Sequence, residues 1–116
     1  MIEIEIPEVA PSLNKLIRLH WAARRKLQQK WAWMVISKRP AITMAPKKAK
    51  VIINRQSPHL LDTDNLYGAS KIIVDALKAA ALIQGDDPAR LNLVCTQNRG
   101  KAETKITVQV DNEPIK

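Results

Sequence analysis

Two carboxylates stand one residue apart at Asp62 and Asp64, just ahead of an apolar stretch with helical periodicity. The chain has 116 residues and a formal net charge of +8, so this pair is a local excess of acid on a basic background. On an extended segment such residues project to the same face, about 7 Å apart at their Cα atoms. Because Mg²⁺ typically takes one or two protein carboxylates and keeps several waters, the pair indicates a metal site. The alternative is that Asp64 caps the helix and Asp62 belongs to a turn.

Two later features would complete such a site. Lys71 lies seven residues after Asp64, which on a continuous helix is two turns and about 10.5 Å of rise along one face. Lysine side chains lean towards the helix N-terminus, so we expect its amino group near a phosphate held by the metal. The alternative is an ion pair with Asp75 at i+4. Asp86 and Asp87 follow the helix, although two acids after a glycine are also typical of a solvated turn.

The elements that must position these residues follow from hydrophobic periodicity. The patterns predict strands over residues 2–6, 49–54, 91–98 and 105–110, a helix over about 21–37, and a second helix that begins between residues 64 and 70 and ends before residue 85. Val51 to Ile53 are nearly continuous in apolar character, which favours a central strand covered on both faces. Asn98 to Gly100 is typical of a hairpin turn.

The length of 116 residues predicts one compact domain over 1–116. The predicted element order is β-α-β-α-β-β, and the predicted fold class is α+β, with a small mixed sheet packed by two helices. We expect residues 111–116 to form a flexible C-terminal end.

Composition restricts the partners. Nineteen Lys and Arg against eleven Asp and Glu favour a phosphate-rich partner, with nucleic acid first. The apolar runs are far shorter than the roughly 20 residues of a membrane span, and the acidic start is unlike a signal peptide. Cys95 has no second cysteine to pair with, so we expect a reducing cytoplasm. The residues predicted to bind backbone phosphates, the alternative being a solvated face, are Arg24, Arg25, Lys26, Lys30 and Arg55.

The aromatic and histidine side chains carry less information. Trp21, Trp31 and Trp33 are more typical of core or dimer contacts than of platforms for base stacking. His20 and His59 have the chemistry to touch a phosphate, but a lone histidine is weak support and neither is assigned a catalytic role.

The motifs together resemble a known family. Asp62-Thr63-Asp64-Asn65-Leu66, then Lys71, Asp75-Ala76-Leu77 and Asp86-Asp87, resembles the signature of the RusA-type Holliday-junction resolvases, crossover-junction endodeoxyribonucleases common in prophages. Pro11-Ser12-Leu13-Asn14-Lys15 with His20-Trp21 is similar to the N-terminal segment of phage-type members. The likeness touches most of the chain from Ile2 to about Val94.

The resemblance implies a compact α+β homodimer that resolves four-way DNA junctions in recombination and repair, using Mg²⁺ or Mn²⁺ and no small-molecule cofactor. Matched by motif, its catalytic and metal-binding acids are Asp62, Asp64 and Asp87, with Lys71 as their basic partner. Asp86 is the alternative to Asp87. One departure is the insertion of residues 67–70 before the lysine, which either extends the helix by a turn or forms a loop whose Ser70 caps a helix starting at Lys71.

This chemistry agrees with elementary requirements for phosphodiester cleavage. Carboxylate-held Mg²⁺ supplies an activated water and neutralises developing charge. A C2 dimer presents two equivalent sites, which matches the two symmetric nicks that resolve a junction. Two alternatives remain: a non-catalytic nucleic-acid-binding protein whose acids serve as caps and ion pairs, and a nuclease of the same chemistry that acts on other branched DNA or on RNA.

Overall fold

The computed structural model describes residues 1–41 and 44–111. Its elements are β1 (Ile2–Ile6), α1 (Leu13–Arg18), α2 (Trp21–Lys38), β2 (Ala49–Ser57), α3 (Thr63–Ala79), β3 (Leu91–Arg99) and β4 (Glu103–Val110). The strands form one sheet in the order β1-β4-β2-β3, in which only the β2–β3 pair is parallel. The predicted α+β class with a small mixed sheet is confirmed.

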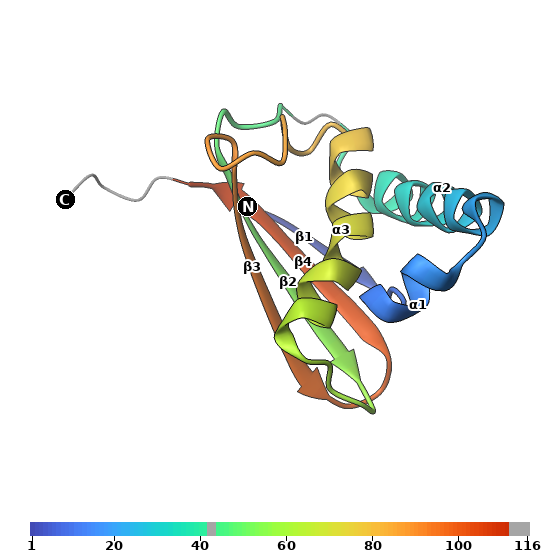
Figure 1. Ribbon diagram of the computed structural model, residues 1–116. Coiled ribbons are helices and arrows are strands. Elements are labelled where there is room, and N and C mark those ends of the chain that lie inside the picture. Colours follow the sequence, from blue (N-terminus) through green and yellow to red (C-terminus); the bar gives the residue numbers. More distant parts are fainter. Residues whose placement is uncertain (42–43, 112–116) are drawn as a thin grey trace.

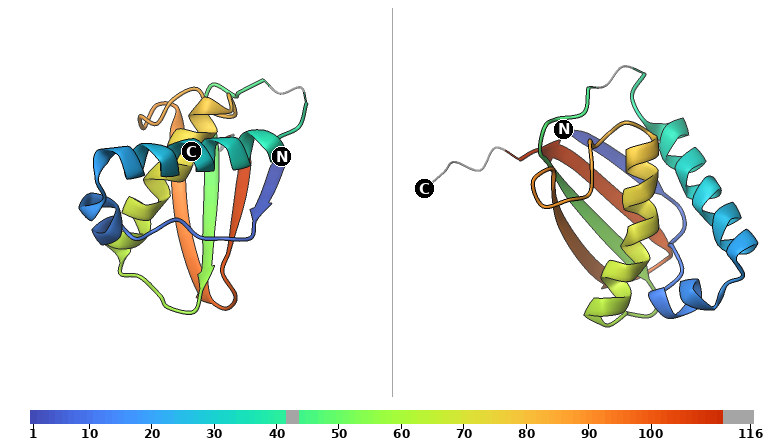
Figure 2. Two further views of the ribbon diagram at one scale, coloured as in Figure 1. Left: turned by 90° about the vertical axis from the view of Figure 1, so that its right-hand side faces the viewer. Right: turned by 45° about the horizontal axis from the view of Figure 1, so that its top comes forward.

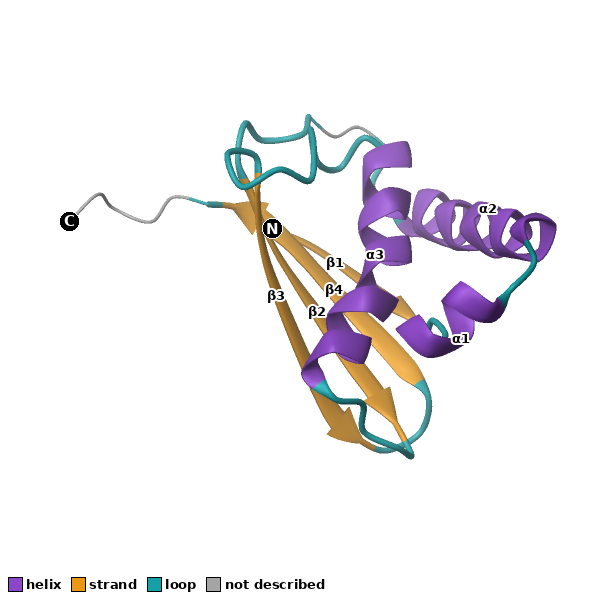
Figure 3. Cartoon of the chain, viewed as in Figure 1, coloured by secondary structure: helices purple, strands orange, loops and turns teal. Residues whose placement is uncertain are grey.

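The helices cover one face of this sheet and leave the other open (Figures 1 and 3). Helix α2 packs against α3 and β1, and both views in Figure 2 place it on the same side as α3. Alternate strand residues fill the covered face, including Ile4, Val51 and Ile106. No helix in the described ranges is long and apolar enough to cross a membrane.

Strand β2 is central, as its apolar run predicted, but it is not covered on both faces. Val51 and Ile53 are buried beneath the helices, whereas Lys50, Ile52 and Asn54 on the open face are half-buried. The neighbouring strands alone shield much of Ile52, because side chains in adjacent strands of a sheet touch. An apolar run in a central strand therefore did not require a second helical layer.

The structure has a third helix, α1, that the sequence analysis did not predict. Ser12 caps it by accepting a hydrogen bond from the Lys15 backbone N–H, at 3.4 Å. A Cβ added to Gly68 would lie 2.6 Å from the Leu13 Cβ, so the glycine is what lets α1 lie directly on α3. Six residues are too few to give α1 a clear periodic signal.

The hairpin predicted at Asn98 to Gly100 is wrong. Strands β3 and β4 are not neighbours, because β2 lies between them and pairs with both. The turn passes over the end of β2 instead, where the Gly100 N–H donates to the Ser57 carbonyl at 3.2 Å. Turn residues show where a chain reverses, but they do not determine which strand it then pairs with.

Helix α3 is continuous through the inserted residues 67–70. Ser70 lies inside it, where its hydroxyl donates to the Leu66 carbonyl at 3.0 Å, so Ser70 is not a cap. The helix ends at Ala79, and Ala81 adopts a left-handed conformation with φ of 58°. The Leu82 N–H then returns to the Leu77 carbonyl at 3.0 Å, which closes the last turn.

Asp111, the first residue of the predicted flexible end, is held in place by the chain. The Asp111 N–H donates to the Lys48 carbonyl at 3.0 Å, and its carboxylate lies 3.4 Å from the Lys48 amino group. Asp111 is therefore held against the start of β2 and does not belong to a flexible end. Residues 112–116 of the predicted end lie outside the described residues.

Candidate metal site at the start of α3

The first acidic motif forms the beginning of α3. Asp62 is the N-cap, and its Oδ1 accepts the Asn65 backbone N–H at 2.9 Å. The Asn65 side-chain amide donates to both Asp62 oxygens at 3.1 Å. These hydrogen bonds, the backbone one foremost, lower the pKa of Asp62 below its ordinary value. The alternative in which Asp64 is the cap is wrong, because the helix starts at Thr63, two residues too early for it.

The two acids do not project from an extended segment as expected. Since α3 begins at Thr63, Asp64 already belongs to its first turn, where residues two apart do not face each other. Asp64 is exposed, and its carboxylate takes no part in the hydrogen bonds and ion pairs of residues 1–41 and 44–111. The turn thus presents one oriented carboxylate and one without a protein partner.

Two residues that the sequence analysis did not single out hold this turn in place. Asn65 Oδ1 accepts the Asn14 backbone N–H at 3.1 Å, which joins the Asp62 cap to α1. Gln97 at the end of β3 clamps the backbone before the cap, accepting the Leu61 N–H at 2.9 Å and donating to its carbonyl at 2.6 Å. Asn65 belongs to the Asp62–Leu66 motif, whereas no pattern in the sequence indicates a role for Gln97.

Lys71 does not point towards the start of α3. Its amino group lies 3.2 Å from Asp75 and 2.8 Å from Asp86, both on the C-terminal side. The Lys78 amino group also lies 3.4 Å from Oδ2 of Asp86. The hydrogen bond with Asp86 is the main cause that raises the pKa of Lys71, and the two lysines lower the pKa of Asp86 to about 2. Two carboxylates on that side overcome the usual lean of a helical lysine, so the expected orientation is wrong.

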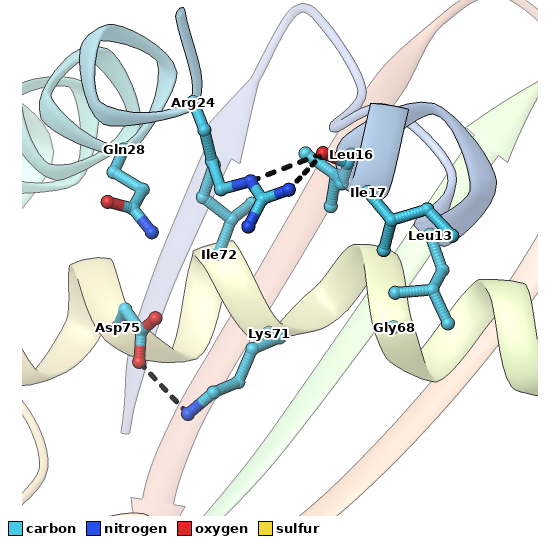
Figure 4. A pocket seen from close by; sticks show the side chains of 9 residues that line it. All are labelled: Leu13, Leu16, Ile17, Arg24, Gln28, Gly68, Lys71, Ile72 and Asp75. Atoms are coloured by element: carbon cyan, nitrogen blue, oxygen red, sulfur yellow. Dashed lines mark hydrogen bonds and ion pairs between the residues drawn. The ribbon is translucent and has the colours of Figure 1, made fainter. Parts of the chain in front are cut away.

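Figure 4 shows the surroundings of the ion pair between Lys71 and Asp75. Lys71 and Asp75 stand on one side of an open groove of about 350 Å³ between α1, α2 and α3. Arg24 lies across from them and donates to the Leu16 carbonyl from Nε and Nη2, at 3.2 and 2.9 Å. Asp62 and Asp64 do not line the groove, so it is not the candidate metal site.

Asp87 lies at the other end of the sheet. Because β2 and β3 are parallel, the chain after α3 returns to the end where β2 began, whereas Asp62 follows the opposite end of β2. The two caps of α3, Asp62 and Ala80, are about 27 Å apart along the helix axis, at a rise of 1.5 Å per residue. Asp87 instead faces Arg90, with Oδ1 3.7 Å from Nε.

The predicted set of Asp62, Asp64 and Asp87 is therefore not assembled within one chain. Among the residues that the structure describes, no group of three or more His, Cys, Asp or Glu side chains is placed to hold a metal ion. Asp62 and Asp64 still match Mg²⁺ in donor type and number, since one or two carboxylates with water suffice for that ion. Asp86, the alternative to Asp87, is occupied by Lys71 and Lys78.

The predicted DNA-binding residues divide into two groups. Arg24 joins α2 to α1, Lys30 pairs with Glu8 at 2.7 Å, and Arg55 Nη1 donates to the Ala10 carbonyl. Arg25 and Lys26 are exposed on α2, and no hydrogen bond or ion pair between described residues involves their side chains. Arg25 and Lys26 can therefore meet phosphates without giving up an existing contact.

The three tryptophans also divide. Trp31 is fully buried in the core, as predicted. Trp21 and Trp33 are 67% and 69% exposed, so within the chain they are not core residues. Their predicted role in dimer contacts stays a prediction.

No family model and no curated protein sequence matches the chain. The likeness to RusA-type resolvases therefore depends on the motif residues themselves. Their placement in the structure is the further observation that bears on it.

Proposed function

We propose that the chain is a Mg²⁺-dependent endodeoxyribonuclease of the RusA type that resolves four-way DNA junctions, acting as a homodimer. The observation that supports this proposal is the meeting of the two motif segments. Leu13 packs on Gly68, and the Asn14 N–H binds Asn65, although 51 residues separate Asn14 and Asn65 in sequence. The early segment thus supports the turn that carries Asp62 and Asp64.

The chemistry assigned to this turn uses its two carboxylates differently. When bound there, Mg²⁺ would supply an activated water and neutralise charge on the scissile phosphate. Asn65 keeps Asp62 ionised and oriented, while Asp64 has no competing partner in the described chain. The net charge of +8 draws DNA, and exposed Arg25 and Lys26 contact its backbone.

A homodimer accounts for Asp87 in this proposal. Since Asp87 lies far from Asp62 and Asp64 in its own chain, it can contribute a third carboxylate only to the site of a partner chain. Two-fold symmetry would generate that arrangement twice, giving two equivalent sites for two nicks. Lys71 would then act from the same end as Asp87, after release from Asp86.

The decisive experiment is nicking of a labelled four-way junction by the full chain in Mg²⁺ and in EDTA. We expect nicking only in Mg²⁺, and Asp64→Asn should reduce it by about 100-fold, since it removes a metal ligand. Glu3→Gln, which removes one exposed carboxylate from β1, is the matched control and should leave nicking unchanged. Tight junction binding without metal-dependent nicks would overturn the proposal, and equal cleavage of linear duplex would remove junction selectivity.

The second candidate is a nucleic-acid-binding protein without catalysis. It is favoured by the structural partners of the other motif acids: Asp62 caps α3, Asp86 binds two lysines and Asp87 faces Arg90. In such a protein Asp64→Asn would change neither junction affinity nor stability appreciably, and the wild type would make no nicks.

A further inference from the structure

A second cavity lies beside the candidate metal site, and it is basic. It has a volume of about 340 Å³ and lies between the segment before α1 and the end of β2. Leu61, the residue before Asp62, forms part of its wall. Its polar side chains are Ser12, Lys15, Arg55, Ser57 and His59, without a carboxylate among the lining residues.

The positive charge of this cavity is not neutralised by the chain. The side chains of Lys15 and His59 are exposed and form no hydrogen bond or ion pair with any described residue. The acids that the structure describes are engaged elsewhere or lie outside the cavity wall, as with Glu8 on Lys30 and Asp86 on Lys71. By contrast, another cavity of similar size is lined by Glu5 and Glu103 together with two lysines, Lys38 and Lys101.

Arg55 places a second cationic side chain in the cavity wall. Its Nη1 donates to the Ala10 carbonyl, but its buried Nε has no hydrogen-bond partner in the described chain. Burial lowers the pKa of Arg55, which means that its charge is desolvated without a compensating anion. In the described chain this half-buried guanidinium is bonded to a neutral carbonyl and to no carboxylate, so its charge remains available to an anion in the cavity.

We propose that this cavity is a phosphate subsite that holds one backbone phosphodiester of DNA next to Asp62. A diester carries one negative charge and acceptor oxygens, which suits a lysine, an arginine and two hydroxyl donors. The inference rests on the proposed nuclease function for its assignment to DNA, but the anion site itself does not. Seated there, a phosphate would fix the position of the strand relative to Asp62 and Asp64.

The test is a ¹H–¹⁵N NMR titration of the full chain with dimethyl phosphate at constant ionic strength, without metal. We expect saturable shifts of the Lys15, Ser57 and His59 signals. Lys15→Ala and His59→Gln should each weaken the affinity by about tenfold, the loss expected for a hydrogen bond to a charged group. Lys47→Ala is the control, since it removes the same charge from an exposed lysine at the other end of β2.

Arg55 is left unsubstituted because loss of its bond to Ala10 would mix folding with binding. Shifts that do not saturate, or an equal loss in Lys47→Ala, would overturn the proposal. Binding of inorganic phosphate without binding of dimethyl phosphate would also overturn it, because that result describes a monoester site and not a backbone site. The titration needs neither metal nor cleavage, so its failure is distinguishable from failure of the nuclease, which the junction assay measures separately.

Discussion

The two ends of α3 both carry ionised carboxylates, but they keep them ionised by different means. At the start, neutral N–H donors of Asn65 lower the pKa of Asp62, and Asp64 has no partner in the described chain. At the end, the amino groups of Lys71 and Lys78 lower the pKa of Asp86 to about 2. The first arrangement stabilises a negative charge without cancelling it, whereas the second cancels it.

This difference determines where a cation can bind. A divalent ion at the end of α3 must displace or repel two ammonium groups before it gains the Asp86 charge. At the start it meets carboxylates whose charge is still available. The same helix therefore carries one end suited to a metal and one end that is a closed ion-pair network, although both resemble acidic motifs in the sequence.

The largest expected effect concerns whether the two ends cooperate between chains. Asp64→Asn and Asp87→Asn should each reduce nicking by about 100-fold alone. Mixed and refolded together, they should regain activity, because a heterodimer would contain one site with all three carboxylates. The measurement is Mg²⁺-dependent junction nicking by the mixture compared with each variant alone.

An inactive mixture of two inactive variants would contradict the shared site, since it would mean that each site draws its acids from one chain. Full activity of Asp87→Asn alone would instead restrict the site to Asp62 and Asp64. The control is a mixture of Asp64→Asn with Asp62→Asn, which should stay inactive because both changes affect the same end of α3.

A smaller effect is expected from the residue that orients the cap. Asn65→Ala removes the amide bonds to Asp62 and the contact with Asn14, so nicking should fall by about tenfold, as for loss of a residue that orients a metal ligand. The Asp62 pKa, followed by ¹³C NMR of the side chain, should rise but stay below its ordinary value, because the backbone bond remains. Asn14→Ala keeps the backbone N–H that Asn65 accepts and should change neither quantity.

The fold class and most of the helices and strands could be predicted from the sequence, because they depend on local periodicity. The alternation in Ile2–Ile6 and the apolar face of α3, which includes Ile73 and Leu77, can be recognised without tertiary information. The pairing of β4 with β2 and the short α1 depend on contacts between distant residues, such as Gly100 with Ser57 and Leu13 with Gly68. No local pattern specifies those contacts.

The candidate site was only half predictable for the same reason. Asp62 and Asp64 are adjacent in sequence, so any fold keeps them together. Placing Asp87 beside them required knowing that β2 and β3 are parallel, and a parallel crossover returns the chain to the wrong end of the sheet. For Lys71 the sequence offered a metal-held phosphate or the local Asp75; the structure has the Asp75 pair, together with the more distant Asp86 that no local spacing indicated.

The ion-pair network predicts a defined response to acid. Asp86 has a folded pKa of about 2 against an ordinary 3.8, so its pairing stabilises the fold above about pH 4 and that contribution is lost as the pH falls through 2. Lys71→Met should raise the Asp86 pKa, measured by ¹³C NMR, and lower stability above about pH 4, and this loss should fade as the pH falls from 4 to 2. Lys78→Met should do so less, since Lys71 makes the shorter bond.

The smallest effect concerns the turn at Ala81, which connects the end of α3 to the segment that carries Asp86. Ala81 occupies the left-handed conformation at φ of 58°, where a Cβ is unfavourable and glycine is normal. Ala81→Gly should therefore raise the free energy of unfolding in urea by about 0.5–1 kcal/mol. Ala79→Gly, two residues earlier in the last helical turn, should lower it by a similar amount of about 0.5–1 kcal/mol. Both alanines are exposed, so changes of opposite sign in the free energy of unfolding would follow from the backbone conformation alone. Changes of the same sign would contradict the left-handed turn that directs the chain from α3 to Asp86.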